Sequence, residues 1–278
     1  MSQQLVAIKK RIKSVSGAYK VTSAMKLVST VKLRRWKDKM LNNKAYSLEL
    51  SSICDEIFSY CEDMESPYVV PNKKATKDLY IIVSSTLGLC GSYNQNVFKI
   101  ADKVITTNDD IVVIGNKGIA HFGNFTSKID TVNYSSNIDP DLIKALTNYA
   151  LTSYAKGEYK KVHIIYSRYK NSLSFIPEDF ILLPLAKEKK ESNTIPPLLE
   201  PSKEKLFNDL IDIYLKSIIH AKLLEAEVCE QAARSNAMEN ATKNAEDLLG
   251  TLKLEFNKAR QAAITEEIVE IVAGSTEV

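Results

Sequence analysis

Proline is missing from both ends of the chain. All eight prolines of the 278 residues lie between positions 67 and 201, together with six of the nine glycines. A proline inside a helix costs about 3 kcal/mol, so two long proline-free segments indicate two long helices. The sequence therefore predicts a helix within residues 1–66, a globular domain over residues 67–201 and a second helix within residues 202–278.

Cysteine and histidine are few and scattered. The four cysteines and three histidines form neither a CxxC pair nor the spacing of a zinc site, so we expect a reducing compartment and no metal. No apolar run approaches the ~18 residues of a membrane span, which predicts no direct membrane insertion. The first residues lack the pattern of a secretory signal, so we expect the chain to act where it is made.

Recognisable catalytic motifs are also missing. The sequence has no GxxxxGK[ST], GxGxxG, GxSxG or HExxH pattern. The segment Gly115-Asn-Lys-Gly118 is the nearest candidate for a phosphate cradle, but a turn in which glycine supplies the backbone angle explains it better. His121 and His163 stand among apolar residues and are interpreted as packed or partly exposed side chains. We therefore expect no enzymatic activity and no cofactor on this chain.

Two further groups resemble reactive sites only superficially. Cys90 lies between Gly88 and Gly91, and we interpret it as a thiol packed in a tight turn, since no partner histidine or second cysteine is indicated. Glu266 and Glu267 are adjacent, but neighbours on a helix point about 100° apart and cannot share a proton.

The first helix carries a narrow apolar stripe. Its members recur at spacings of three and four, and they are Leu5, Ile8, Ile12, Val15, Tyr19, Thr22 and Met25. Such a stripe is typical of a coiled-coil seam, and we expect it to continue through Val28 and Leu33. A helix over residues 3–60 would be about 85 Å long at 1.5 Å per residue.

The last helix is predicted to start after Pro201-Ser202, where the serine can cap the first turn. Its stripe is apolar at first, becomes small and alanine-rich over residues 232–245, and is large again over residues 248–256. An apolar tip follows at residues 268–272. Because helices of this length are not stable alone in water, we expect the two end helices to pair in an antiparallel coiled coil.

The middle of the chain is predicted to be α/β. Runs of Ile, Val and Tyr at residues 78–85, 110–116 and 161–169 suit strands that are buried on both faces. Helical patterns at residues 93–105 and 139–156 fall between them. Strands alternating with helices predict a small Rossmann-like domain with a mainly parallel sheet.

Positive charge is concentrated at one end. Residues 1–44 carry twelve Lys and Arg residues against a single acid, Asp38. This surface could follow a nucleic-acid backbone, face acidic loops of a protein partner or simply be solvated. Aromatic residues for base stacking are sparse, with Tyr19, Trp36 and Tyr46 far apart, which favours the latter two interpretations.

These segments resemble the γ subunits of F-type ATP synthases. The similarity lies in residues 11–15 and 24–35, in Gly88-Leu-Cys-Gly91 with Tyr93-Asn94, and in residues 231–245 and 256–268. The motifs occur in the order typical of the family and span nearly the whole chain.

The resemblance implies a non-catalytic rotor that turns inside a ring of three α and three β subunits, whose β subunits bind nucleotide. The implied partners are these α and β subunits, an ε/δ-type small subunit and a membrane c-ring, with no nucleic acid. It also implies a peripheral complex on the cytoplasmic face of the bacterial plasma membrane. A cytoplasmic location would follow if the rotor were not coupled to a membrane ring.

The resemblance further implies contacts with the lever and catch loops of the β subunits. Arg260 and Gln261 would bind the catch loop. The α/β domain, residues 67–201, would be the foot of the rotor, and its residues Leu199 and Glu200 would make contacts towards the membrane ring. The remaining implied contacts are Met25, Lys9, Lys20, Lys26, Lys32, Arg34, Arg35 and Cys90.

The sequence departs from the family at two places. Thr86 and Leu87 occupy positions where the family usually has an acid followed by Lys or Arg, and an aromatic-rich stretch before Pro201 is replaced by residues 194–200. The foot is therefore less typical than the helices. This leaves two loads open: a proton-translocating ring, or another load on a specialised F-type-like ATPase.

The alternatives from other functional classes make distinct predictions. A nucleic-acid-binding coiled coil would bind DNA or RNA at low salt with an affinity that falls steeply as salt rises, which a binding titration at several ionic strengths would measure. A nucleotide-binding enzyme would require the isolated residues 67–201 to bind a nucleotide. Lack of binding at low salt eliminates the first alternative, and lack of nucleotide binding eliminates the second.

Overall fold

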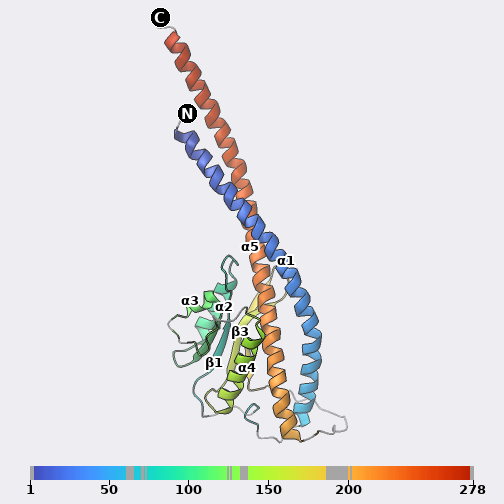
Figure 1. The fold of residues 1–278 in the computed structure, drawn as a ribbon. Helices are drawn as coiled ribbons and strands as arrows, with labels where there is room; N and C mark the ends of the chain where they lie inside the picture. Colours follow the sequence, from blue (N-terminus) through green and yellow to red (C-terminus); the bar gives the residue numbers. More distant parts are fainter. Residues whose placement is uncertain are drawn as a thin grey trace. The chain divides into compact units, whose positions relative to one another are not determined.

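The computed structural model describes residues 3–60, 66–69, 72, 74–123, 125, 127–131, 137–185, 200 and 202–275. It contains two long helices, α1 (Gln3–Tyr60) and α5 (Lys203–Ser275), as the proline-free ends predict (Figure 1). By compactness the chain divides into a first unit, Met1–Thr30 with Arg234–Val278, and a second unit, Val31–Ala233. Both helices contribute to both units, so this division differs from the three consecutive segments expected from the sequence.

The first unit is an antiparallel pair of helices. The Thr22 hydroxyl accepts a hydrogen bond from Thr242 at 2.9 Å, and the Thr30 and Ser235 hydroxyls lie 3.0 Å apart. The residue numbers of the α5 partners decrease as those of the α1 residues increase, as antiparallel packing requires. The predicted pairing of the two end helices is therefore confirmed.

The seam of the first unit follows the predicted stripe with one correction. Leu5 and Ile8 are buried, and the stripe residues from Ile12 to Met25 are partly buried. Val28, however, is 57% exposed, and Ser29 is buried in its place. The spacing explains the difference, since Ser29 lies four residues after Met25 and returns to the same face.

The second unit contains a four-stranded mixed sheet. Its strands are β1 (Leu79–Val83), β2 (Asp110–Ile114), β3 (Val162–Tyr169) and β4 (Phe175–Leu183), in the order β2-β1-β3-β4. The first three are parallel and match the predicted strands, and they are buried almost throughout. The Rossmann-like α/β class with a mainly parallel sheet is confirmed.

Strand β4 was not predicted. It pairs antiparallel with β3 at the edge of the sheet, and its residues are exposed or half-buried up to its end, where Leu182 and Leu183 are buried. Its centre, Pro177-Glu178-Asp179, is unlike the apolar runs of the other strands. Proline is tolerated at a sheet edge because no further strand needs its missing N–H, which explains why sequence pattern alone overlooked this strand.

Helices cover both faces of the sheet. Helices α2 (Tyr93–Val104) and α4 (Pro140–Ala155) lie where the sequence predicts them, and the Asp139 side chain caps α4 by accepting a hydrogen bond from the Asp141 amide. The short α3 (Asn116–His121) occupies a segment expected only to be a turn.

The core of the second unit has two layers. On one face of the sheet, α4 and the early part of α5 pack on alternate strand residues such as Ile81 and Ile164, through Leu146 and Leu215 among others. On the other face, α2 and α3 pack on Tyr80 and its neighbours. The early part of α5 is therefore a structural element of the α/β core.

Leucine truncation tests this layering. Leu146→Ala should lower the free energy of unfolding by about 2–5 kcal/mol, because Leu146 is 1% exposed in the layer between the sheet and helices α4 and α5. Leu173→Ala is a matched control, since Leu173 is 82% exposed, and it should change stability by less than about 0.5 kcal/mol. Urea denaturation measures both; equal losses would contradict the described core.

Candidate partner interfaces

The turn after β2 is closed by the chain itself. The Gly118 amide donates to the Ser84 hydroxyl at 2.8 Å, and the Lys117 amide donates to the Ser85 carbonyl at 3.1 Å. Gly115 has a φ of 92°, and a Cβ there would lie 2.3 Å from the Ser84 carbonyl oxygen. A phosphate cradle needs amides that are free to bind the anion. The βα turn that we expected is therefore present at Gly115, while Asn116 to Gly118 belong to the start of α3.

The turn after β1 is braced by Asn94. Its carboxamide accepts from the Ser85 amide at 3.0 Å and donates to the Ser85 hydroxyl at 2.8 Å and to the Cys90 sulfur at 3.3 Å. Cys90 is 2% exposed and packs with Tyr93 and Cys229. The interpretation of Cys90 as a packed thiol is confirmed.

This burial corrects the implied contact of Cys90 with a partner's loop. The thiol lies inside the chain, whereas Leu87 and Leu89 are 64% and 61% exposed. Leu89 has a φ of 63°, an uncommon backbone conformation for a bulky residue. The surface that this turn presents is thus apolar and formed by the two leucines.

Cys229 connects α5 to the sheet. Its sulfur donates to the Ser167 carbonyl at 3.2 Å, and burial raises the pKa of the thiol. The Tyr93 hydroxyl donates to the Ala226 carbonyl of the same helix at 3.3 Å. A buried, protonated thiol is a poor nucleophile, so Cys229 acts in packing.

Of the two histidines of the α/β domain, His163 is packed and His121 is partly exposed, as expected. His163 is buried, stacks on Tyr80 and places Nδ1 2.8 Å from an Asp179 oxygen. His121 stacks on Phe98, and its Nε2 lies 3.0 Å from an oxygen of Asp102. Over the described ranges of the chain, no cluster of three His, Cys, Asp or Glu side chains could hold a metal ion.

The cationic residues of α1 are mostly exposed. Among the implied contact residues, Lys9 and Lys20 are exposed in the first unit, and Lys32, Arg34 and Arg35 are exposed in the second unit. Their side chains are available to an acidic partner. Met25 is partly buried in the seam, so only some of its surface is accessible.

Lys26 differs from the other cations because it already has an acidic partner. Its Nζ lies 2.8 Å from Glu239 of α5, and this hydrogen bond and charge hold the pKa of Glu239 below its ordinary value. The family resemblance implied a partner contact for Lys26 and gave no indication of Glu239. Only the antiparallel register of the two helices places Lys26 opposite Glu239. The sequence alone does not give that register, so it could not predict this pair.

Arg260 and Gln261 are exposed on α5 within the first unit. Arg260 lines a hollow of about 340 Å³ between the two helices, together with Leu5, Lys9, Phe256, Ala263, Ile264 and Glu267. The structure therefore brings Arg260 and Lys9, two of the implied contact residues, to one site. Gln261 is not among the residues that line it.

The implied foot contacts are described only incompletely. Glu200 is exposed, whereas Leu199 lies outside the described residues.

In the turn after β1, the Thr86 hydroxyl donates to the Asn137 side chain at 3.3 Å. None of the helices, as far as the chain is described, combines the length and apolar character needed to cross a membrane.

Comparisons with known proteins agree along the whole chain. The family described as ATP synthase matches residues 4–277. The ATP synthase gamma chain of Mycoplasma mobile is 36% identical over 98% of each chain, and that of Malacoplasma penetrans is 39% identical over 96% of this chain and 97% of its own.

Solved structures share the fold. The rotor of Euglena gracilis mitochondrial ATP synthase aligns with a TM-score of 0.66 at 18% identity, covering 94% of this chain and 98% of its own. A chain from the central stalk and c-ring structure of the Tetrahymena thermophila mitochondrial ATP synthase aligns with a TM-score of 0.61 at 23% identity, covering 80% and 99%.

The pairing of Lys26 with Glu239 can be tested by titration. Lys26→Met should raise the pKa of Glu239 towards its ordinary value, because the cation that lowers it is removed. With the lysine present, the pair stabilises the fold above the ordinary pKa of the carboxyl, and that contribution is lost as pH falls through the lowered pKa. NMR titration of labelled glutamate carboxyls measures the shift.

Lys20→Met is the matched control, since Lys20 is exposed on the same helix and is not the partner of Glu239. It should leave the pKa of Glu239 unchanged. An unchanged pKa in Lys26→Met would show that the two side chains are apart in solution.

Proposed function

The chain belongs to the ATP synthase family, as a relative of its gamma chains, and on that premise we propose that it is the central rotor shaft of an F-type ATP synthase or ATPase. The observation that carries this proposal is the antiparallel pairing of α1 with α5 in a chain whose family match runs from residue 4 to residue 277. Rotation of this pair would be coupled to ATP synthesis or hydrolysis in partner subunits.

The proposed partners are the α and β subunits of a catalytic ring, with an ε/δ-type small subunit and, where the rotor drives ion transport, a membrane c-ring. The β subunits would bind nucleotide and carry out the phosphoryl chemistry. This chain would be non-catalytic, with no cofactor of its own and no nucleic acid as a partner. Its place would be the cytoplasmic face of the membrane, within a peripheral complex.

The proposed contacts with the β subunits divide by chemistry. The exposed Lys9, Lys20, Lys32, Arg34 and Arg35 suit an acidic lever loop, because each offers an uncovered positive charge. Lys26 would contribute less, since Glu239 already balances its charge. Met25 would add a partly exposed apolar contact at the lever.

Arg260 and Gln261 are proposed to bind a catch loop. Both side chains are exposed, and together they can donate several hydrogen bonds to one loop. Arg260 would hold its position beside the hollow that it lines with Leu5 and Phe256.

The load at the foot has two candidates. A proton-translocating ring is the ordinary one for the family. A specialised F-type-like ATPase with another load is favoured by the turn after β1, where exposed Leu87 stands in place of a charged residue. The two are separated by the proteins that copurify with the chain, because only the first requires a membrane ring.

Reconstitution tests the rotor role. Mixed with its cognate α and β subunits, the full chain should form a complex with ATPase activity, and a bead attached to the chain should rotate during hydrolysis. Failure to recover such a complex would refute the role.

Substitution at the proposed catch contact tests the two assigned residues. Replacing both Arg260 and Gln261 by Ala should reduce coupled ATP synthesis about tenfold, since a hydrogen bond from a charged group contributes about 1.5–3 kcal/mol. Arg168→Ala, in strand β3, is a control that should leave coupling unchanged. ATP synthesis and single-molecule torque measure the effect; unchanged torque in the double variant would rule out the assignment.

A further inference from the structure

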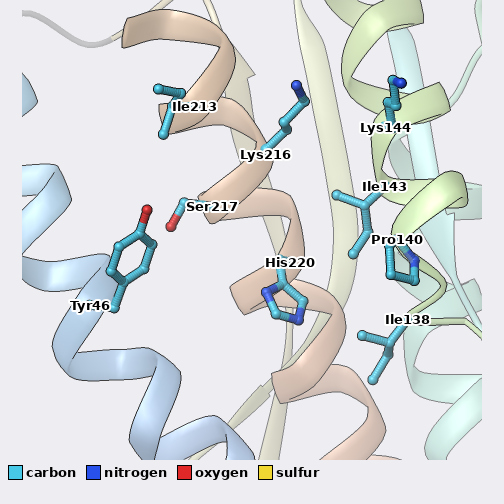
Figure 2. A pocket seen from close by; sticks show the side chains of 9 residues that line it. All are labelled: Tyr46, Ile138, Pro140, Ile143, Lys144, Ile213, Lys216, Ser217 and His220. Carbon is cyan, nitrogen blue, oxygen red and sulfur yellow. The ribbon is translucent and has the colours of Figure 1, made fainter.

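Two adjoining hollows in the second unit form one groove over α5. Their volumes are about 490 and 460 Å³, and they share Tyr46, Ile138 and His220. Figure 2 shows α5 as the floor, with Tyr46 of α1 on one side and Ile138, Pro140 and Ile143 at the start of α4 on the other. We call this the α5 groove.

The α5 groove is elongated. Its floor contains Ile213, Ser217, His220 and Leu224, which recur at spacings of three and four and so lie on one face of α5. The eleven steps of helix from Ile213 to Leu224 measure about 16 Å. A floor of that length suits a docked helix of about three turns better than it suits a compact small molecule.

The α1 wall follows the same length. It runs from Trp36 through Lys39 and Asn43 to Tyr46, again at helical spacing. Asn43 donates to the Ser47 hydroxyl, which lies 3.3 Å from that of Ser217. This polar link fixes α1 beside α5, so the groove is held open by the chain's own contacts.

The charged groups of the α5 groove are of one sign. Lys39, Lys144 and Lys216 line it, and no Asp or Glu is among its lining residues. Lys216 is paired with Asp212, one turn earlier on α5, so its charge is partly balanced and it contributes less to the positive charge of the groove. His220 stays neutral near pH 7, because burial and then the charge of Lys39 lower its pKa.

Between these cations the groove is apolar. Tyr46 is 57% and Ile213 is 45% exposed, although large side chains of this kind are costly to leave in water. Trp36 lies under the ammonium of Lys39, 4.5 Å from the ring centroid. The aromatic and aliphatic side chains of the groove, with basic residues beside them, match the apolar face and acidic flanks of an amphipathic helix.

We propose that the α5 groove docks an acidic amphipathic helix of a partner protein. The apolar face of that helix would cover Tyr46, Ile138 and Ile213, and its acidic residues would approach Lys39 and Lys144. This binding function is separate from the proposed contacts with a catalytic ring, because none of the residues that line the groove is among those contacts.

The sole tryptophan of the chain, Trp36, lines the groove and provides a direct reporter. The probe is a synthetic 18-residue helix with Leu at i, i+3, i+4 and i+7 and Glu on its flanks, added to the full-length chain. We expect its binding to shift Trp36 emission to the blue in a saturable way. The same peptide with Lys in place of Glu should bind at least tenfold more weakly.

Charge reversal locates the binding. Lys144→Glu should weaken the acidic peptide at least tenfold and strengthen the basic one, because the sign of one wall is inverted. Lys103→Glu is the matched control, since it makes the same change on exposed α2 outside the groove, and it should leave both affinities within twofold. Circular dichroism of each variant verifies that it is folded.

Three outcomes of the peptide experiments would overturn the proposal. They are no emission change with either peptide, equal binding of the two peptides, and equal effects of Lys144→Glu and Lys103→Glu. In the purified complex, a photo-crosslinker at position 46 should react with an acidic helical segment of another subunit. A crosslink to a basic segment or to a second copy of this chain would also overturn it.

Discussion

Neither long helix can exist without the other, and the rest of the molecule depends on that constraint. A single helix of 58 or 73 residues exposes its apolar stripe to water, and its own hydrogen bonds do not compensate. Pairing removes the stripe from water. In the first unit it does so with little bulk, because the small side chains of Ser29 and Ser235 are buried and Thr22 and Thr242 are joined by a hydrogen bond across the pair.

In the second unit, α5 has a different structural role. The early part of α5 is built into the α/β core, where Leu215 packs in the layer between sheet and helices, and Tyr93 and Cys229 provide hydrogen bonds to fix it. The sheet is therefore anchored to α5 by apolar packing and by buried polar contacts together. That anchoring holds the start of α4 beside α5 and so defines one wall of the α5 groove.

Sequence pattern predicted what depends on local repetition. The absence of proline located both helices, and apolar runs located three strands, because each signal lies within one segment. Strand β4 was missed since Pro177 and its acidic neighbours mark an edge position that only the neighbouring β3 makes favourable. Site residues were harder: the balanced charge of Lys26 and the burial of Cys90 arise from partners that are distant in sequence.

The pairing of the two ends also dictates an order of events during synthesis. Thr22 leaves the ribosome 220 residues before Thr242, its partner across the seam. At about 5–20 residues per second, the early part of α1 waits roughly 10–40 s with its apolar stripe uncovered. The sheet, by contrast, is complete once β4 has emerged. The nascent chain therefore passes through a stage in which the α/β domain can begin to form while its N-terminal segment still lacks its partner helix.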